Sequence, residues 1–137
     1  MHQKHLIMTY NVHSEMLGHL KKCLPEEGCG LVCGDGKIIS KIMIVENILH
    51  SPTRFICDPE GLIRSFEIIE RNNLELMGIF HSHLNGLETP SCLDVKDHLY
   101  PVTMIIWTSK RNEWIMKCFH VSTEKYKEIE WSLIYEN

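Results

Sequence analysis

The sequence predicts a single mixed α/β domain of the α+β type over residues 1–137, with helices flanking one mixed, mostly antiparallel sheet. Apolar residues recur at helical spacing over residues 12–23 and 59–72, which indicates two helices. Short apolar runs separated by turn residues indicate the strands. No repeat, linker or low-complexity stretch interrupts this pattern. A chain of 137 residues is long enough to build one hydrophobic core, so we expect one domain.

The first elements are expected to be a helix and a hairpin. In the helix over residues 12–23, Asn11 is the expected N-cap and Pro25 ends the element. Residues 28–33 and 38–46 are apolar runs joined by a turn with two glycines, which permit the positive dihedral angles of a tight hairpin. We therefore expect these two runs to pair as antiparallel strands.

The second helix has the clearest start signal in the chain. Asp58 is the expected N-cap, and Pro59 occupies the first helical position, where its fixed φ suits the helix. Asn72-Asn73 is expected to close the element. Four apolar residues of this helix are expected to face the core: Leu62, Ile63, Phe66 and Ile69.

Residues 76–81 predict a buried strand by their length and composition. We expect this strand to end at His81 and to deliver His81 and His83 into a polar loop that contains glycine and proline. Such loops commonly carry functional residues. Residues 91–100 are expected to form a short helix before Pro101.

The last third of the chain predicts strands. Residues 102–107 and 113–121 are expected to form a hairpin around a polar turn. In residues 124–134, apolar side chains alternate at Ile129, Trp131 and Leu133, which favours a strand, although helical spacing is also present.

The composition excludes several classes of protein. Hydrophobic residues make up 44% and charged residues 23% of the chain, as in ordinary globular proteins, so disorder is not expected. The net charge of -4 disfavours a nucleic-acid partner. No apolar run is long enough for a secretory signal or a membrane span, so we expect a cytoplasmic protein with no membrane contact. Without a signal or a CxxC pair, the six cysteines are expected to be reduced: Cys23, Cys29, Cys33, Cys57, Cys92 and Cys118.

A set of metal-ligand residues is the strongest functional signal. His81 and His83 are two residues apart on an extended segment, so both imidazoles project from one face and can reach one ion. A short loop after the histidines can bring the carboxylate of Asp94 to the same ion. Two nitrogens and one oxygen leave the fourth tetrahedral position to water, which is the pattern of a catalytic zinc site.

Ser91 and Asp94 also fit a purely structural interpretation. Their spacing is that of a capping box, in which both side chains satisfy backbone N–H groups at the start of a helix. We expect the two roles to compete, because a carboxylate committed to zinc should not also lie fully over the N-cap amide.

A zinc hydrolase also needs a base that takes a proton from the attacking water and returns it to the leaving amine. Glu26 and Glu27 supply adjacent carboxylates just before the strand expected at residues 28–33. Spacing alone does not choose between them.

Together these residues carry a family resemblance. The pattern Pro-x-Glu-x-x-Gly-Leu from Pro25, then His-Ser-His from His81, Ser91 and Asp94, resembles the motif of the JAMM (MPN-plus) metalloproteases. The resemblance extends to Asn47 and the segment 51–54, and it covers most of residues 17–110. It implies the JAMM/MPN fold, which is similar to that of cytidine deaminases.

The resemblance also implies the roles of the site residues. One zinc ion per chain would be bound by His81, His83 and Asp94. Glu27 would be the general base and acid, and Ser91 would help to hold the oxyanion. The family hydrolyses peptide or isopeptide bonds, usually at the C-terminus of ubiquitin or a ubiquitin-like protein.

The chain departs from the family pattern after the second histidine. Leu84 occupies the position where the family most often has proline, so the loop 84–90 and substrate fit are expected to differ. The stretch between Asp94 and Val102 has no room for the long insertion of linkage-selective deubiquitinases. The compact form resembles prokaryotic members that process ubiquitin-like sulfur-carrier proteins and expose a C-terminal Gly-Gly.

Two alternatives belong to other functional classes. The chain could be a non-catalytic MPN binding module, but all the ligands and Glu27 are present, which disfavours that class. It could also be a cupin-like oxygenase, because His81, His83 and Glu88 imitate the spacing of an iron site. Cupins are almost entirely β, whereas two helices are expected here.

Overall fold

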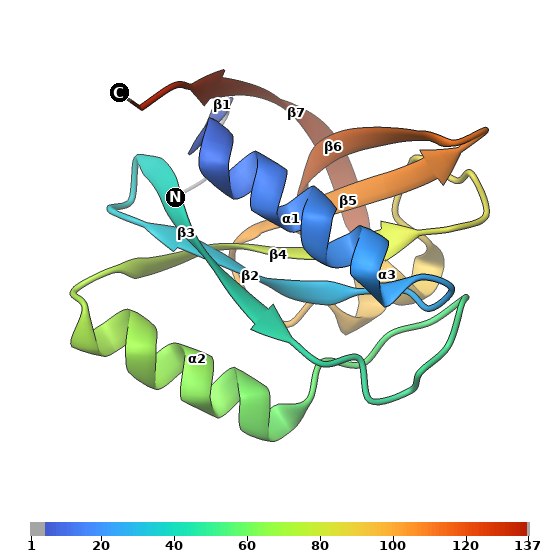
Figure 1. The fold of residues 1–137 in the computed structure, drawn as a ribbon, viewed down its shortest axis with the longest axis horizontal. Helices are drawn as coiled ribbons and strands as arrows, with labels where there is room; N and C mark the ends of the chain where they lie inside the picture. The colour runs from blue at the N-terminus through green and yellow to red at the C-terminus, as the bar shows by residue number, and fades with distance from the viewer. Residues whose placement is uncertain (1–4, 137) are drawn as a thin grey trace.

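The computed structural model describes residues 5–136 of the chain. In chain order the elements are β1 (His5–Thr9), α1 (Tyr10–Cys23), β2 (Cys29–Gly34), β3 (Ile38–Val45), α2 (Pro59–Arg71), β4 (Glu75–His83), α3 (Cys92–Asp97), β5 (Thr103–Lys110), β6 (Glu113–Ser122) and β7 (Lys125–Ile134). Figure 1 shows how these elements are arranged around one curved sheet. The predicted mixed α/β class is confirmed.

The strands form one closed sheet in the order β1-β3-β2-β4-β5-β6-β7, with β7 returning to β1. Strand β2 pairs antiparallel with β3 and β4, and β6 pairs antiparallel with β5 and β7. The parallel pairs are β1 with β3, β1 with β7, and β4 with β5. The sheet is therefore mixed and mostly antiparallel, as predicted.

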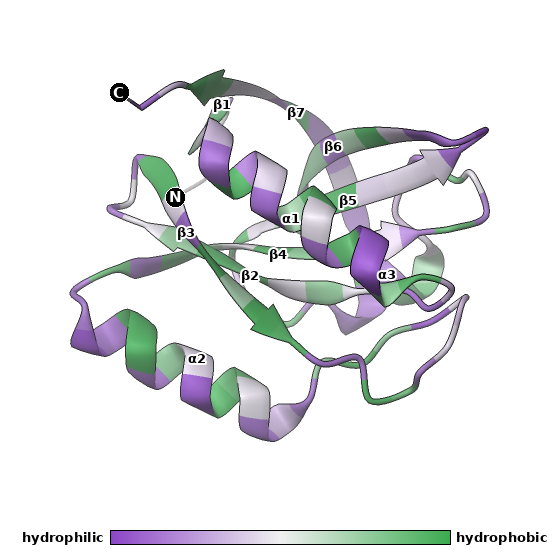
Figure 2. Cartoon of the chain, viewed as in Figure 1, coloured by the Kyte–Doolittle hydropathy of each residue, from purple (hydrophilic) through white to green (hydrophobic). Residues whose placement is uncertain are grey.

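The two long helices pack against opposite faces of this sheet (Figure 1). Side chains alternate along a strand, so successive residues of β2 face opposite sides of the sheet and pack on the sides covered by different helices. Val32 belongs to the core cluster that includes the buried face of α1, whereas Leu31 and Cys33 belong to the cluster that packs against α2. Figure 2 shows the matching alternation of apolar and polar residues along α2.

The first helix begins earlier than the sequence predicts. Its N-cap is Thr9, whose hydroxyl accepts a hydrogen bond from the N–H of Val12 at 3.2 Å, so the assignment of Asn11 as the cap is wrong. The preceding strand β1 was not predicted. Its five residues are too few to show a periodic pattern, and the parallel pairing with β3 and β7 stabilises the strand.

The second helix begins as predicted, with Asp58 as its N-cap and Pro59 in the first turn. Its buried stripe runs through Gly61, Ser65 and Ile69. Ile63 lies outside this stripe and is 58% exposed, so its assignment to the core face is wrong. Leu62 and Phe66 are partly buried against the same core cluster as Ile69.

The remaining elements follow the predictions in type and order but differ in some of their ends. Strand β4 continues through His83, so both histidines lie on the strand and not in the loop. The pairing with β5 reaches His83 and holds this end of the strand in extended conformation. The last segment, for which a helix was also possible, is the strand β7. No helix within residues 5–136 is long and apolar enough to cross a membrane.

Candidate functional site

Three metal-ligand side chains converge at the end of β4. His81 and His83 project from the same face of the strand, and their Nε2 atoms are 3.2 Å apart. Asp94 comes from α3, and its Oδ2 lies 3.3 Å from Nε2 of His81 and 2.9 Å from Nε2 of His83. The two histidines are buried, with 1% and 5% of their surfaces exposed. One atom from each residue is therefore directed at a common point.

The donor atoms of this group fit a zinc ion. Zinc–ligand bonds of about 2.0–2.1 Å at tetrahedral angles separate neighbouring ligand atoms by about 3.3 Å. The separations of 2.9, 3.2 and 3.3 Å in this group are close to that value. Two imidazoles and one carboxylate are also a ligand set that zinc accepts. His81, His83 and Asp94 therefore form a candidate metal-binding group.

Asp94 performs its capping role and faces the histidines with the same atom. Its Oδ2 accepts the N–H of Ser91 at 2.9 Å, and the hydroxyl of Ser91 accepts the N–H of Asp94 at 3.0 Å. These bonds complete the capping box of α3, which is shorter than predicted and ends at Asp97. One carboxylate oxygen can serve both directions because it has two lone pairs, and the competition expected once zinc is bound remains a prediction.

The charges of the group are coupled. Burial lowers the pKa of His81, although the hydrogen bond to Asp94 opposes this effect. Burial acts in the same direction on His83, but the Asp94 carboxylate and a backbone carbonyl outweigh it and raise the pKa of His83. Burial would raise the pKa of Asp94, yet the two histidines more than offset it and hold this pKa well below its usual range. Asp94 is therefore anionic, which favours a cation at this position.

Glu27 precedes β2 and is held by its backbone. Its carbonyl accepts a hydrogen bond from Nδ2 of Asn47 at 2.9 Å, and its N–H donates to the carbonyl of Ser51 at 2.8 Å. The next residue, Gly28, donates its N–H to the buried hydroxyl of Ser82 at 2.8 Å. Since Ser82 lies between the two histidines of β4, this bond fixes the position of Glu27 relative to the metal-ligand group.

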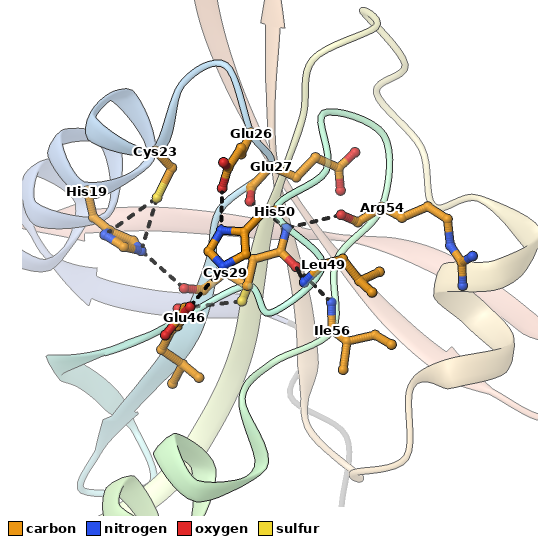
Figure 3. Close-up of polar contacts among 12 residues, drawn as sticks. His19, Cys23, Glu26, Glu27, Cys29, Glu46, Leu49, His50, Arg54 and Ile56 are labelled. Atoms are coloured by element: carbon orange, nitrogen blue, oxygen red, sulfur yellow. Dashed lines mark hydrogen bonds and ion pairs between the residues drawn. The ribbon is translucent and has the colours of Figure 1, made fainter.

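The structure distinguishes Glu27 from its neighbour Glu26. Glu27 is only 6% exposed, and its burial raises its pKa to about 7, with a further increase from the Asp94 charge and an opposing effect of His83. Glu26 instead pairs with His50, with 3.0 Å between Oε1 and Nδ1. Figure 3 shows Glu27 directed away from this pair. Of these two carboxylates, Glu27 is the one that combines burial with electrostatic coupling to the metal-ligand group.

Asn47 is a positioning residue whose role the sequence did not reveal. Besides its bond to Glu27, its Nδ2 donates to the carbonyl of Arg54 at 3.0 Å. Its Oδ1 accepts the N–H groups of Leu49 and Ile56, both at 3.1 Å. In Figure 3, dashed lines reach the labelled partners Leu49, Arg54 and Ile56. A single buried amide thus ties Glu27 to the segment between β3 and α2; the only sequence signal was the place of Asn47 in the family resemblance.

A pocket of about 360 Å³ opens beside the metal-ligand group. His81, Ser91 and Asp94 line one side of it. The rest of the wall is mostly apolar and includes Phe55, Leu62, Leu93, Leu99 and Tyr100. A mostly apolar surface therefore leads up to the metal-ligand group.

The cupin-like interpretation is not supported by the position of Glu88. Its carboxylate pairs with Lys117 at 3.2 Å and with Lys110 at 3.5 Å, and it is not part of the metal-ligand group. His98 also lies outside this group, since its Nε2 is hydrogen-bonded to the carbonyl of Val102 at 2.7 Å. The HxH pair is completed by Asp94 and not by Glu88.

Comparisons with known proteins agree with this geometry. A family model described as prokaryotic homologs of the JAB domain matches residues 9–121. The desampylase of Pyrococcus furiosus is 34% identical over 113 residues, which cover 80% of this chain and 76% of that protein. The probable TtuB-protein conjugate cleaving protease of Thermus thermophilus is 33% identical over 94 residues, or 68% of this chain and 63% of that protein. A JAB1/MPN domain protein from Archaeoglobus fulgidus shares the fold, with a TM-score of 0.63, 17% identity, and coverage of 96% of this chain and 100% of that one.

Proposed function

This chain belongs to the prokaryotic JAB domain family, a family of JAMM-type metalloproteases, and from that membership we propose its substrate and the roles of its residues. The proposed reaction is hydrolysis of a peptide or isopeptide bond at the C-terminus of a ubiquitin-like protein of the sulfur-carrier type. The observation that carries the proposal is the convergence of His81, His83 and Asp94 beside a buried Glu27.

His81, His83 and Asp94 would hold one zinc ion through two Nε2 atoms and one carboxylate oxygen. When bound, zinc lowers the pKa of a coordinated water to about 7 and polarises a carbonyl oxygen. The burial of the two histidines excludes bulk water from one side of the site and strengthens electrostatic interactions there.

Glu27 is proposed as the general base and acid. A carboxylate with a pKa of about 7 can accept a proton near neutral pH and can also release it again. Glu27 would take the proton from the attacking water and deliver it to the leaving amine. The backbone bonds to Asn47 and Ser51 hold it ready for both steps.

Ser91 is proposed to stabilise the oxyanion. Its hydroxyl oxygen accepts the N–H of Asp94, so its own hydrogen remains free to donate to a substrate oxygen. The residue lines the pocket beside Asp94. A donor at this position can stabilise the negative charge that develops on the carbonyl oxygen during attack.

The proposed substrate class is supported by the names of the two curated relatives, one of which refers to cleavage of TtuB-protein conjugates. The apolar pocket beside the metal-ligand group offers a surface for an extended C-terminal tail. Neither nucleic acid nor a membrane is expected as a partner, in keeping with the net charge of -4.

The proposal is tested with two matched substrates of one ubiquitin-like protein that ends in Gly-Gly. One carries a further peptide after Gly-Gly, and the other is joined through Gly-Gly to a lysine side chain of a carrier. Mass spectrometry of the products should show cleavage after Gly-Gly by the zinc-loaded protein. The relative rates assign the preferred bond. No cleavage of either substrate by protein that holds one zinc per chain would favour a non-catalytic binding module.

A further inference from the structure

His83 also makes contacts on the side of its ring that faces away from the metal-ligand group. In the parallel pairing of β4 with β5, His83 lies directly opposite Thr108. Paired residues of neighbouring strands project from the same face of a sheet. The imidazole and the Thr108 side chain are therefore neighbours, and Thr108 is only 1% exposed.

Both side chains meet at one backbone atom. Oγ1 of Thr108 donates to the carbonyl oxygen of Leu87 at 2.7 Å, and Nδ1 of His83 lies 2.9 Å from the same oxygen. A carbonyl oxygen only accepts hydrogen bonds, so Nδ1 must carry the hydrogen. In a neutral imidazole, Nε2 then has a free lone pair, and this is the nitrogen that lies 2.9 Å from Asp94.

The loop that supplies this carbonyl is held at several points. The N–H of Leu87 donates to Oδ1 of Asn85 at 3.0 Å, and Gly86 between them has a φ of 84°, which suits glycine. The next residue, Glu88, is paired with Lys110 and Lys117. Among these loop contacts, the part-buried Thr108 bond is the one that acts directly on the Leu87 carbonyl oxygen.

We propose that Thr108 is a positioning residue for the metal ligand His83, acting through the Leu87 carbonyl. This inference rests on the proposed zinc function. The Thr108 hydroxyl fixes the position of the Leu87 carbonyl by a hydrogen bond. The carbonyl in turn fixes the orientation and tautomer of the His83 imidazole, so that its Nε2 already faces the metal site before a metal binds. Groups that orient metal-bound histidines in this way typically change metal affinity by about ten- to a hundred-fold.

The test measures zinc affinity by competition with a chromophoric chelator, independently of any peptidase assay. Thr108→Val, which keeps the shape but removes the hydroxyl, should weaken zinc binding by about ten- to a hundred-fold. Thr108→Ser restores the hydroxyl and should bind zinc as the wild type does. Thr103→Val is the matched control, since Thr103 is another buried threonine of β5 but is paired with Gly78, away from the site.

A second variant covers the case in which Thr108→Val does not fold. Asn85→Ala removes the bond to the Leu87 N–H in an exposed part of the loop and should weaken zinc binding in the same direction. Undiminished zinc affinity in folded Thr108→Val would overturn the inference alone. So would undiminished affinity in Asn85→Ala if Thr108→Val does not fold, or an equal loss in Thr103→Val. A wild-type chain that binds no zinc would overturn the proposed function itself.

Discussion

The ring of Phe55 stacks on the imidazole of His81, with the ring centroids 4.3 Å apart and the planes inclined by 22°. Phe55 lies in the segment between β3 and α2, which Asn47 ties to the backbone of Glu27. One segment therefore contacts a metal-ligand residue, holds the proposed base and forms part of the pocket wall. We expect these three features to respond together when the segment is altered.

Removal of the Phe55 ring should affect both metal binding and substrate binding. In Phe55→Ala, His81 loses its stacking partner and the pocket loses an apolar wall, so we expect weaker zinc binding and a kcat/KM reduced by about ten-fold or more. Phe55→Tyr keeps the ring and serves as the control. Chelator competition and steady-state kinetics measure the two effects, and wild-type values for both in Phe55→Ala would show that the stack has no functional role.

The proposed base is tested by a pair of adjacent substitutions. Glu27→Gln removes proton transfer but no metal ligand, so it should retain zinc while turnover falls by about a hundred-fold or more. Glu26→Gln changes the neighbouring carboxylate, which pairs with His50, and should retain turnover. Metal analysis and single-turnover assays measure these effects. Loss of turnover in Glu26→Gln with full activity in Glu27→Gln would show that Glu26, and not Glu27, is the base.

The burial of Glu27 predicts a pH-dependent stability of the metal-free protein. Burial raises the pKa of Glu27 from 4.5 to about 7, so the folded state favours the protonated form. Its contribution to stability is therefore present at low pH and is lost as the pH rises from about 4.5 through about 7. Glu27→Gln stays neutral at every pH. Its melting temperature in the presence of chelator should exceed that of the wild type at about pH 8 and match it at about pH 4; a constant difference would argue against the raised pKa.

Ser91 is expected to contribute separately to turnover and to helix capping. Ser91→Ala should lower turnover by about ten- to a thousand-fold through loss of the oxyanion contact. It also removes the N-cap hydroxyl of α3, which costs about 1 kcal/mol of stability. Ser91→Thr keeps a hydroxyl and should recover both. If the melting temperature falls in Ser91→Ala while turnover is unchanged, Ser91 caps the helix but does not stabilise the oxyanion.

Much of the fold could be predicted because most elements carry local signals. Asp58 and Pro59 begin α2 as the capping rules predict, and the alternation at Ile129, Trp131 and Leu133 indicates the strand β7. Strand β1 was missed because its stability comes from parallel pairing with distant strands. The extension of β4 through His83 likewise depends on its pairing with β5.

In the site too, the residues with a local spacing pattern could be predicted, whereas contacts between distant segments could not. Spacing brought His81, His83 and Asp94 into one hypothesis, whereas Glu26 and Glu27 could not be separated until their burial was known. The supporting bonds of Asn47, Ser82 and Thr108 join segments that are far apart in the chain. Asn47 and Ser82 take part in the family resemblance, but nothing in the sequence pattern identifies the partners of these three side chains.

The most direct test of the account compares zinc-loaded protein, chelator-treated protein and zinc-loaded Glu27→Gln on one isopeptide conjugate of a Gly-Gly-ending ubiquitin-like protein. Intact mass spectrometry of the products identifies the bond that is cut. We predict release of the ubiquitin-like protein with a free C-terminal Gly-Gly by the zinc-loaded wild type alone. Equal cleavage by the chelator-treated protein or by Glu27→Gln, or no cleavage by any of the three, would contradict a zinc peptidase that uses Glu27 as its base.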